Sequence, residues 1–156
     1  MQVGEIMHTD VKTATANDTF AEVAKIMRLN GISSVVVLEG PRLAGIVTER
    51  DIVNLIAAGG DPHSVQVVHG MTRRDIETVT AKTDLAECAE QMASRNIRHL
   101  PVMDGDQIVG IISIRDLTRW AAEELSGGHE MPDIRRSTAA LRAATELQKQ
   151  RRKGAS

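Results

Sequence analysis

Hydrophobic residues follow two patterns that alternate along the chain. In one pattern they are spaced by a helical turn, and in the other they form short continuous runs. Phe20, Val23 and Met27 lie one helical turn apart and predict a helix that begins after Thr19 and ends at Gly31. The surrounding apolar runs predict three strands and a second helix, at Lys12–Thr15, Ser33–Leu38, Leu43–Val47 and Asp51–Ala58. The first part of the chain is therefore expected to have the order β-α-β-β-α.

The same order returns 65 residues later: this shift carries Arg50 to Arg115 and Asp51 to Asp116, with no gap from Lys12 through Ala57. The second copy predicts a helix between Asp84 and Asn96, strands at Glu77–Thr80, His99–Met103 and Ile108–Ile112, and a helix at Asp116–Leu125. Two aligned pairs, Thr19 with Glu22 and Asp84 with Glu87, predict capping boxes at the first helix of each copy. One copy buries little apolar surface alone, so we predict an α+β fold in which two repeats pack about a pseudo-twofold axis.

The repeats divide the chain into residues 1–62, residues 63–126 and a tail of residues 127–156. Within the tail, Pro132–Lys153 predicts a helix with a basic end. A solvated end is the simplest interpretation, because cations are favourable at a helix C-terminus. The alternatives are a contact with a partner protomer, which we prefer, and a contact with nucleic acid or an acidic partner.

Composition argues against several classes of function. Phe20 and Trp120 are the only aromatic residues of 156 and the net charge is −2, which does not favour nucleic-acid binding. Cys88 is the only cysteine, and His8, His63, His69 and His129 have no ligand spacing, so no metal site is expected. The N-terminal residues do not resemble a signal peptide and no apolar run is long enough to span a membrane, which predicts a cytoplasmic protein.

Several linked motifs then resemble one family. They are Gly45–Ile52, Gly110–Leu117, Ile97–Val102 and the paired starts at Met7 and Met71. Together, at a fixed repeat distance, they resemble the cystathionine-beta-synthase (CBS) domain pair, or Bateman module, from about Met1 to Ser126. The resemblance implies a regulatory pair that binds adenosine-containing ligands in clefts between the repeats and often dimerises into a flat disc.

Two acidic residues open the second helix of each repeat, in Thr48-x-x-Asp51 and Ser113-x-x-Asp116. This spacing caps a helix and would occur without any ligand. The resemblance implies a further role, in which Asp51 and Asp116 accept hydrogen bonds from the ribose hydroxyls. Both interpretations can hold for the same residues.

Arginine precedes both aspartates, at Arg50 and Arg115. An arginine is unfavourable at a helix N-terminus, so finding it there twice favours a phosphate contact over a merely solvated side chain.

Basic residues distinguish the two predicted clefts. By resemblance, Arg98 and His99 face the phosphates of a ligand, whereas the first repeat carries Ser33 and Ser34 in their place. We therefore expect unequal clefts, with the His99 side better suited to di- or triphosphates. Further ligand contacts implied by the resemblance are Leu100, Pro101 and the short first strands at Thr13, Ala14, Thr78 and Val79.

The leading hypothesis is a sensor of energy state or metabolites that binds AMP, ADP or ATP, forms a homodimer and regulates an unidentified protein. The alternative is a structural dimerisation or interaction module with vestigial clefts. An enzyme is not expected, because the repeats and the tail leave no room for a catalytic domain and no catalytic cofactor is implied. His99, Ser113 and Asp116 could mimic a hydrolytic triad, but Ser113 and Asp116 serve the helix cap.

Overall fold

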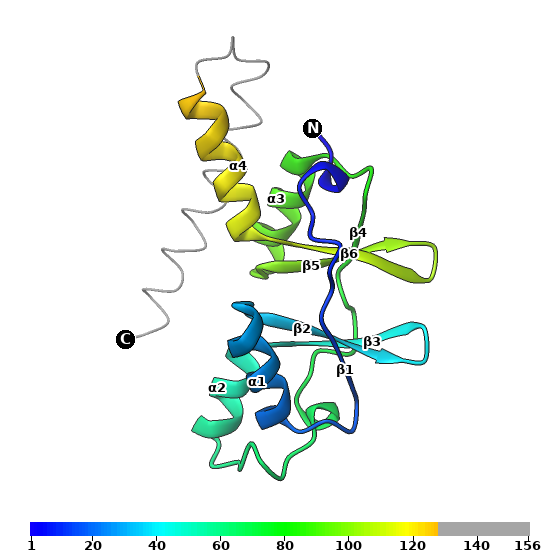
Figure 1. Cartoon of the computed structure of the whole chain (residues 1–156), viewed down its shortest axis with the longest axis vertical. Helices are drawn as coiled ribbons and strands as arrows, with labels where there is room; N and C mark the ends of the chain where they lie inside the picture. The colour runs from blue at the N-terminus through cyan, green and yellow to red at the C-terminus, as the bar shows by residue number, and fades with distance from the viewer. Residues whose placement is uncertain (128–156) are drawn as a thin grey trace. The chain divides into compact units, whose positions relative to one another are not determined.

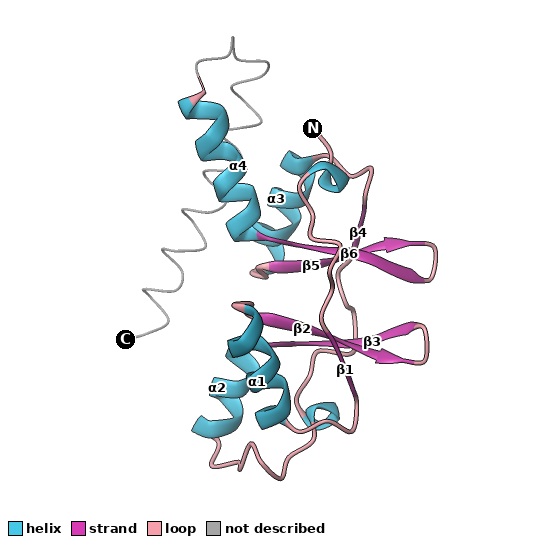
Figure 2. Cartoon of the chain, in the orientation of Figure 1, coloured by secondary structure: helices cyan, strands magenta, loops and turns pink. Residues whose placement is uncertain are grey.

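The computed structural model describes residues 1–127, and the helix predicted at Pro132–Lys153 lies outside this part of the chain. The first repeat consists of β1 (Thr13–Thr15), α1 (Phe20–Asn30), β2 (Ser34–Glu39), β3 (Arg42–Thr48) and α2 (Glu49–Ala57). The second consists of β4 (Val79–Thr80), α3 (Leu85–Arg95), β5 (His99–Asp104), β6 (Gln107–Ser113) and α4 (Ile114–Ser126). Figures 1 and 2 show this order, which confirms the predicted α+β class and the β-α-β-β-α repeat.

Each repeat builds one three-stranded sheet, in the orders β1-β2-β3 and β4-β5-β6. β1 pairs parallel to β2, and β4 pairs parallel to β5. Parallel neighbours need a crossover, which α1 and α3 supply. β2 and β3 form an antiparallel hairpin whose register joins Ser34 to Thr48. The hairpin therefore brings the start of β2 beside the start of α2, where the candidate site residues lie.

The first helix of each repeat begins and ends at the expected residues. Thr19 and Glu22 form the predicted capping box of α1. Asp84 caps α3 by accepting a hydrogen bond from the amide of Ala86 at 2.9 Å. At the C-terminal ends, Gly31 and Asn96 both adopt the left-handed conformation, with φ of 64° and 54°. Glycine and asparagine tolerate this conformation, which stops a helix.

The chain divides into two compact units that do not follow the order of the sequence. One unit contains the second repeat, with Thr78–Asp104 and the chain from Val109 on, together with the N-terminal segment Met1–Thr9. The other contains Asp10–Glu77, with the turn Gly105–Ile108. The repeat boundaries expected after residues 62 and 126, and the packing about a pseudo-twofold axis, stay predictions.

Each unit has its own core. Phe20, Val35 and Val47 are fully buried in the first repeat, and Leu85, Leu100 and Leu117 are at most 1% exposed in the second. Cys88 also lies in the second core, where burial raises the pKa of its thiol to about 12. The thiol therefore stays protonated, as expected for an apolar core residue rather than a nucleophile.

A short segment from outside each repeat completes each sheet. Thr72 and Ile46 exchange two backbone hydrogen bonds in one unit, and His8 and Ile111 exchange two in the other. The segments approach closely because a glycine faces each of them. A Cβ at Gly45 would lie 2.6 Å from Met71 Sδ and 2.9 Å from the carbonyl oxygen of Thr72.

The equivalent contact in the second repeat is less tight. A Cβ at Gly110 would lie 2.6 Å from Met7 Sδ, but 3.1 Å from the carbonyl oxygen of His8. The methionine side chains can move, and both carbonyls are held by strand amides, Thr72 by Ile46 and His8 by Ile111. The shorter distance to the Thr72 oxygen is therefore what separates the two contacts. We infer that the segment around Met71 is the more constrained of the two.

Replacing either glycine tests this close packing. Gly45→Ala is expected to lower the free energy of unfolding by about 1–3 kcal/mol, because the new methyl group overpacks against backbone. Gly110→Ala should cost less, because the nearest backbone oxygen lies 3.1 Å from the new methyl group rather than 2.9 Å. Chemical denaturation of both variants measures the difference, with Ala58→Ser at an exposed position as the control. Equal stability of wild type and Gly45→Ala would contradict the contact.

Candidate functional site

In the first repeat, the strand-to-helix junction holds Asp51 by only one of its carboxylate oxygens. Asp51 Oδ2 accepts hydrogen bonds from the Thr48 backbone amide at 2.8 Å and from Thr48 Oγ1 at 3.0 Å. These bonds cap α2, as the spacing predicted. Among the described residues, Asp51 Oδ1 has no hydrogen-bond partner. One oxygen thus remains able to accept a hydroxyl group.

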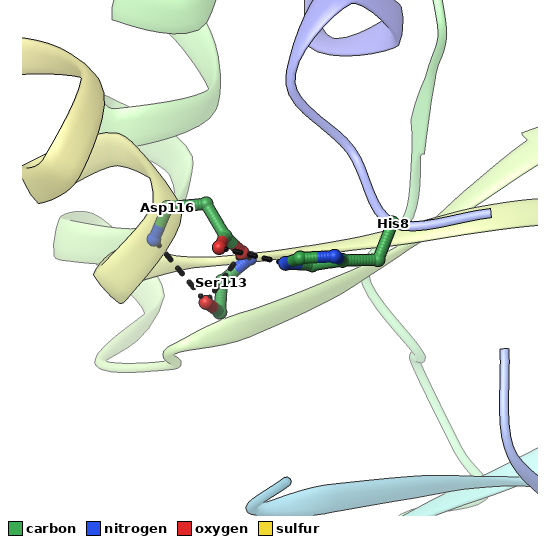
Figure 3. Close-up of polar contacts among 3 residues, drawn as sticks. All are labelled: His8, Ser113 and Asp116. Carbon is green, nitrogen blue, oxygen red and sulfur yellow. Dashed lines mark hydrogen bonds and ion pairs between the residues drawn. The ribbon is translucent and has the colours of Figure 1, made fainter. Parts of the chain in front are cut away.

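The second repeat repeats this cap. Asp116 Oδ2 accepts from the Ser113 amide at 2.8 Å and from Ser113 Oγ at 2.6 Å, and the Asp116 amide donates to Ser113 Oγ at 3.4 Å. Here, however, the second oxygen is engaged as well. Oδ1 lies 2.9 Å from Nε2 of His8, whose segment belongs to the same unit (Figure 3). A carboxylate only accepts, so His8 Nε2 donates this bond.

Each arginine is the second residue of its helix, and the amide of the residue before it already has a partner. The Ile114 amide donates to the carbonyl oxygen of Arg98 at 2.9 Å, and the Glu49 amide donates to that of Ser33 at 3.1 Å. With the Asp116 amide also bonded, two of the first three amides of α4 are engaged. An anion here would therefore depend more on the exposed Arg115 guanidinium than on the helix amides.

His99 lies in the electrostatic range of three charged site residues. Burial lowers its pKa from 6.5 to about 4, with further lowering by Arg98 and Arg115 and an opposing effect of Asp116. Its imidazole is therefore neutral at pH 7. The site in this unit gains positive charge from the two arginines, whereas His99 contributes only hydrogen-bonding nitrogens.

The other predicted contact residues differ in whether their side chains are buried or exposed. The side chains of Ala14, Val79, Leu100 and Pro101 are buried, as is that of Ser34. Any contact that these residues make with a ligand would run through backbone atoms. By contrast, the side chains of Thr13 and Arg50 are exposed, and those of Ser33, Thr78 and Arg98 are partly buried.

The order of the polar groups in the second repeat does not match a hydrolytic triad. A triad needs a histidine between the serine and the acid, so that the imidazole can take the hydroxyl proton. Here the acid lies in the middle: Ser113 Oγ donates to Asp116, and Asp116 accepts from His8 on its other oxygen. The Ser113 hydroxyl thus directs its proton to the cap, as expected.

Sequence reasoning did not identify His8. The repeat was aligned with a shift of 65, which sets His8 against Arg73. The close approaches of Met7 to Gly110 and Met71 to Gly45 show that this segment matches with a shift of 64. His8 then corresponds to Thr72, and the paired starts at Met7 and Met71 were the signal that could have revealed it.

No group of three or more potential metal-binding side chains comes together among residues 1–127. Within these residues, no helix combines the length and the apolar character needed to cross a bilayer.

Comparison with known proteins decides the family. A family model of the CBS domain matches residues 3–58 and again residues 66–123. The chain belongs to the CBS domain family. Among CBS relatives, an uncharacterized 17.7 kDa protein of Acidianus ambivalens is 38% identical over 120 residues, which cover 76% of this chain and 71% of that protein.

Solved CBS structures similar to this chain include complexes with adenosine ligands. The CBS domain pair of protein MJ0100, in complex with 5′-methylthioadenosine and S-adenosyl-L-methionine, is 27% identical, with a TM-score of 0.73 over 78% of this chain and 96% of that one. The CBS domain protein PAE2072 from Pyrobaculum aerophilum, complexed with AMP, is 26% identical. Its TM-score is 0.69 over 75% of this chain and 90% of that one.

The lowered pKa of His99 predicts a pH dependence of stability. Between pH 6.5 and about 4, the unfolded chain binds a proton at His99 that the folded chain does not. Stability is therefore lost as the pH falls through this window, by about 2–3 kcal/mol at pH 4.5 from this residue.

Thermal unfolding between pH 7.5 and 4.5 measures this effect. His99→Gln should flatten the decline in Tm relative to wild type, because the variant has no imidazole to protonate. His63→Gln, at an exposed histidine, is the matched control and should leave the decline unchanged. Identical pH profiles for wild type and His99→Gln would refute the buried, neutral imidazole.

Proposed function

We propose that this CBS protein is a regulatory module that binds adenosine-containing ligands, with AMP, ADP and ATP the leading candidates. The observation that carries the proposal is the capped aspartate at each strand-to-helix junction. Capping fixes the carboxylate through Oδ2 and, at Asp51, leaves Oδ1 to accept hydrogen bonds from a sugar. An ionised carboxylate oxygen has two lone pairs, so Oδ1 can accept hydrogen bonds from the vicinal hydroxyls of a ribose.

The named ligands of the two solved relatives support this ligand class. AMP, 5′-methylthioadenosine and S-adenosyl-L-methionine share an adenosine group and differ at the 5′ position of the sugar. A carboxylate that recognises the ribose suits all three. The 5′ substituent would then be read by other residues, and this chain offers Arg98 and Arg115 in the second repeat.

The arginines give the two repeats different preferences in this proposal. Ser33 and Ser34 carry no charge, so the first repeat has Arg50 as its one candidate phosphate contact. The second repeat has two guanidinium groups and is the better candidate for phosphorylated ligands, although His99 adds no charge at pH 7. Neither repeat is proposed to catalyse a reaction.

A thermal-shift panel tests the proposal. We expect a ligand at about a hundred times its Kd to stabilise the fold by about 2.7 kcal/mol, or several degrees in Tm. The panel contains AMP, ADP, ATP, S-adenosylmethionine, 5′-methylthioadenosine and NAD. Each variant is compared with and without ligand, so that any loss of helix capping cancels.

Asp51→Asn and Asp116→Asn should each reduce the ligand-induced shift, and the double variant should abolish it. Glu22→Gln is the matched control, because Glu22 caps α1 through Thr19 in the same way and at 2.7 Å, but outside the site. A shift that survives in the double variant would exclude the aspartates as the ribose-binding groups. No shift with any compound would favour the alternative, an interaction module with vestigial sites.

An apolar surface on the first repeat supports homodimer formation as part of the same proposal. α2 buries none of its residues fully, and Val53 and Ile56 are 62% and 57% exposed one turn apart. Exposed apolar side chains on one helical face are typical of interaction surfaces.

Val53→Lys with Ile56→Lys is expected to shift the molar mass measured by light scattering from dimer toward monomer, since charges at an apolar interface are costly. Asn54→Lys, at an exposed position on the same helix, should leave the mass unchanged. A wild-type chain that is monomeric at high concentration would refute the dimer.

A further inference from the structure

The N-terminal segment places a histidine on the carboxylate that we propose to bind the sugar in the second repeat. His8 Nε2 donates to Asp116 Oδ1 at 2.9 Å (Figure 3). The two backbone hydrogen bonds between His8 and Ile111, both 2.9 Å long, hold the histidine at this position. The contact is therefore built into the fold of this unit.

With His8 in place, both oxygens of Asp116 are engaged. Oδ2 serves the helix cap through Ser113, and Oδ1 receives the imidazole. With the ring in place the Asp116 side chain is only 6% exposed, so a ribose hydroxyl has little surface by which to approach it. A sugar can bind this carboxylate fully only when the imidazole moves away.

The first repeat lacks this contact. Thr72 occupies the place of His8, bonded to Ile46 through the same pair of backbone hydrogen bonds. Asp51 Oδ1 has no hydrogen-bond partner among the residues that the structure describes. The two repeats thus present the same carboxylate in two states, one open and one closed by a histidine.

We propose that His8 is an intramolecular competitor that occupies the ribose-binding oxygen of Asp116 and lowers the affinity of the second repeat for nucleosides. This inference rests on the proposed function, because it requires that the aspartates bind the sugar. The first repeat then fills at lower concentrations of a nucleoside. The second repeat responds only when the ligand displaces the imidazole.

Displacement does not require unfolding of the segment. The His8 side chain is 58% exposed, so rotation about its side-chain bonds can carry the ring into solvent. The backbone bonds to Ile111 can persist meanwhile. Removing one exposed hydrogen bond of this kind should change affinity by about three- to tenfold.

A role of His8 as a ligand contact predicts the opposite change in affinity. If His8 stayed beside the bound ligand and donated to its sugar or phosphate, removing the imidazole would weaken binding. The sign of the change in affinity therefore separates the competitor from a ligand contact.

Isothermal titration of the full chain with 5′-methylthioadenosine measures this sign. This probe has the sugar but no phosphate, so the arginines contribute little to its binding. In an Asp51→Asn background, which reports on the second repeat, His8→Thr should raise the affinity by about three- to tenfold. In an Asp116→Asn background, the reciprocal Thr72→His should lower the affinity at Asp51 by a similar factor.

His69→Thr, at an exposed histidine remote from both carboxylates in sequence, is the control and should change neither affinity. Circular dichroism and Tm of every variant establish that the fold is retained. Asp116-dependent binding that is unchanged or weakened by His8→Thr would overturn the competitor while leaving the proposed function intact. Absence of aspartate-dependent binding in all variants would overturn both.

Discussion

The hydrogen bonds between each aspartate and the residue three positions before it hold the strand-to-helix junction in one geometry. Asp51 and Asp116 use a single oxygen for this purpose, accepting from both the amide and the hydroxyl group of Thr48 or Ser113. The cap fixes the carboxylate at the edge of the sheet and the start of the helix. Because the cap uses only one oxygen, it also holds the other oxygen rigidly as a hydrogen-bond acceptor. Helix capping and the proposed binding of a sugar are therefore compatible in the same residue.

The segments before each first strand decide how the two acceptors differ. Gly45 and Gly110 lack the side chain that would keep these segments away, so Met71 and Met7 pack directly over the strands. The residue after each methionine is then bonded to a fixed strand position. A threonine there leaves Asp51 open, whereas a histidine reaches Asp116. The two segments differ at several positions, and the residue after the methionine is the one that makes the carboxylates unequal.

The fold could be predicted well because its signals are local and appear twice. The helix spacing, the left-handed residues Gly31 and Asn96, and the apolar strands all recur at a constant distance, and each is confirmed. The capping role of the aspartates was also predictable, since it depends on residues three positions apart. Their role in binding a sugar came from the family resemblance and stays a prediction.

The rest of the site depends on contacts that are distant in the sequence. His8 and Asp116 are separated by 108 positions, and the repeat alignment began only at Lys12, beyond the segment that carries the histidine. The charge state of His99 was equally hidden. Histidine is a basic residue type, which suggested a positive charge. Burial and the neighbouring Arg98 instead favour the neutral form, and the burial of one side chain cannot be deduced from the spacing of residues in the sequence.

The His8–Asp116 contact and the neutral His99 change the ligand preferences expected of the two repeats. Charge alone would make the second repeat the stronger nucleotide site, because it has two arginines where the first has one. If the aspartates bind the sugar as proposed, the closed carboxylate acts in the other direction, since it penalises the sugar that every adenosine ligand shares. In that case a ligand with several phosphates that contact Arg98 and Arg115 would compete with His8 better than an uncharged nucleoside would. The second repeat would thus discriminate by the 5′ substituent more sharply than its arginines alone would allow, because binding must first overcome an internal competitor.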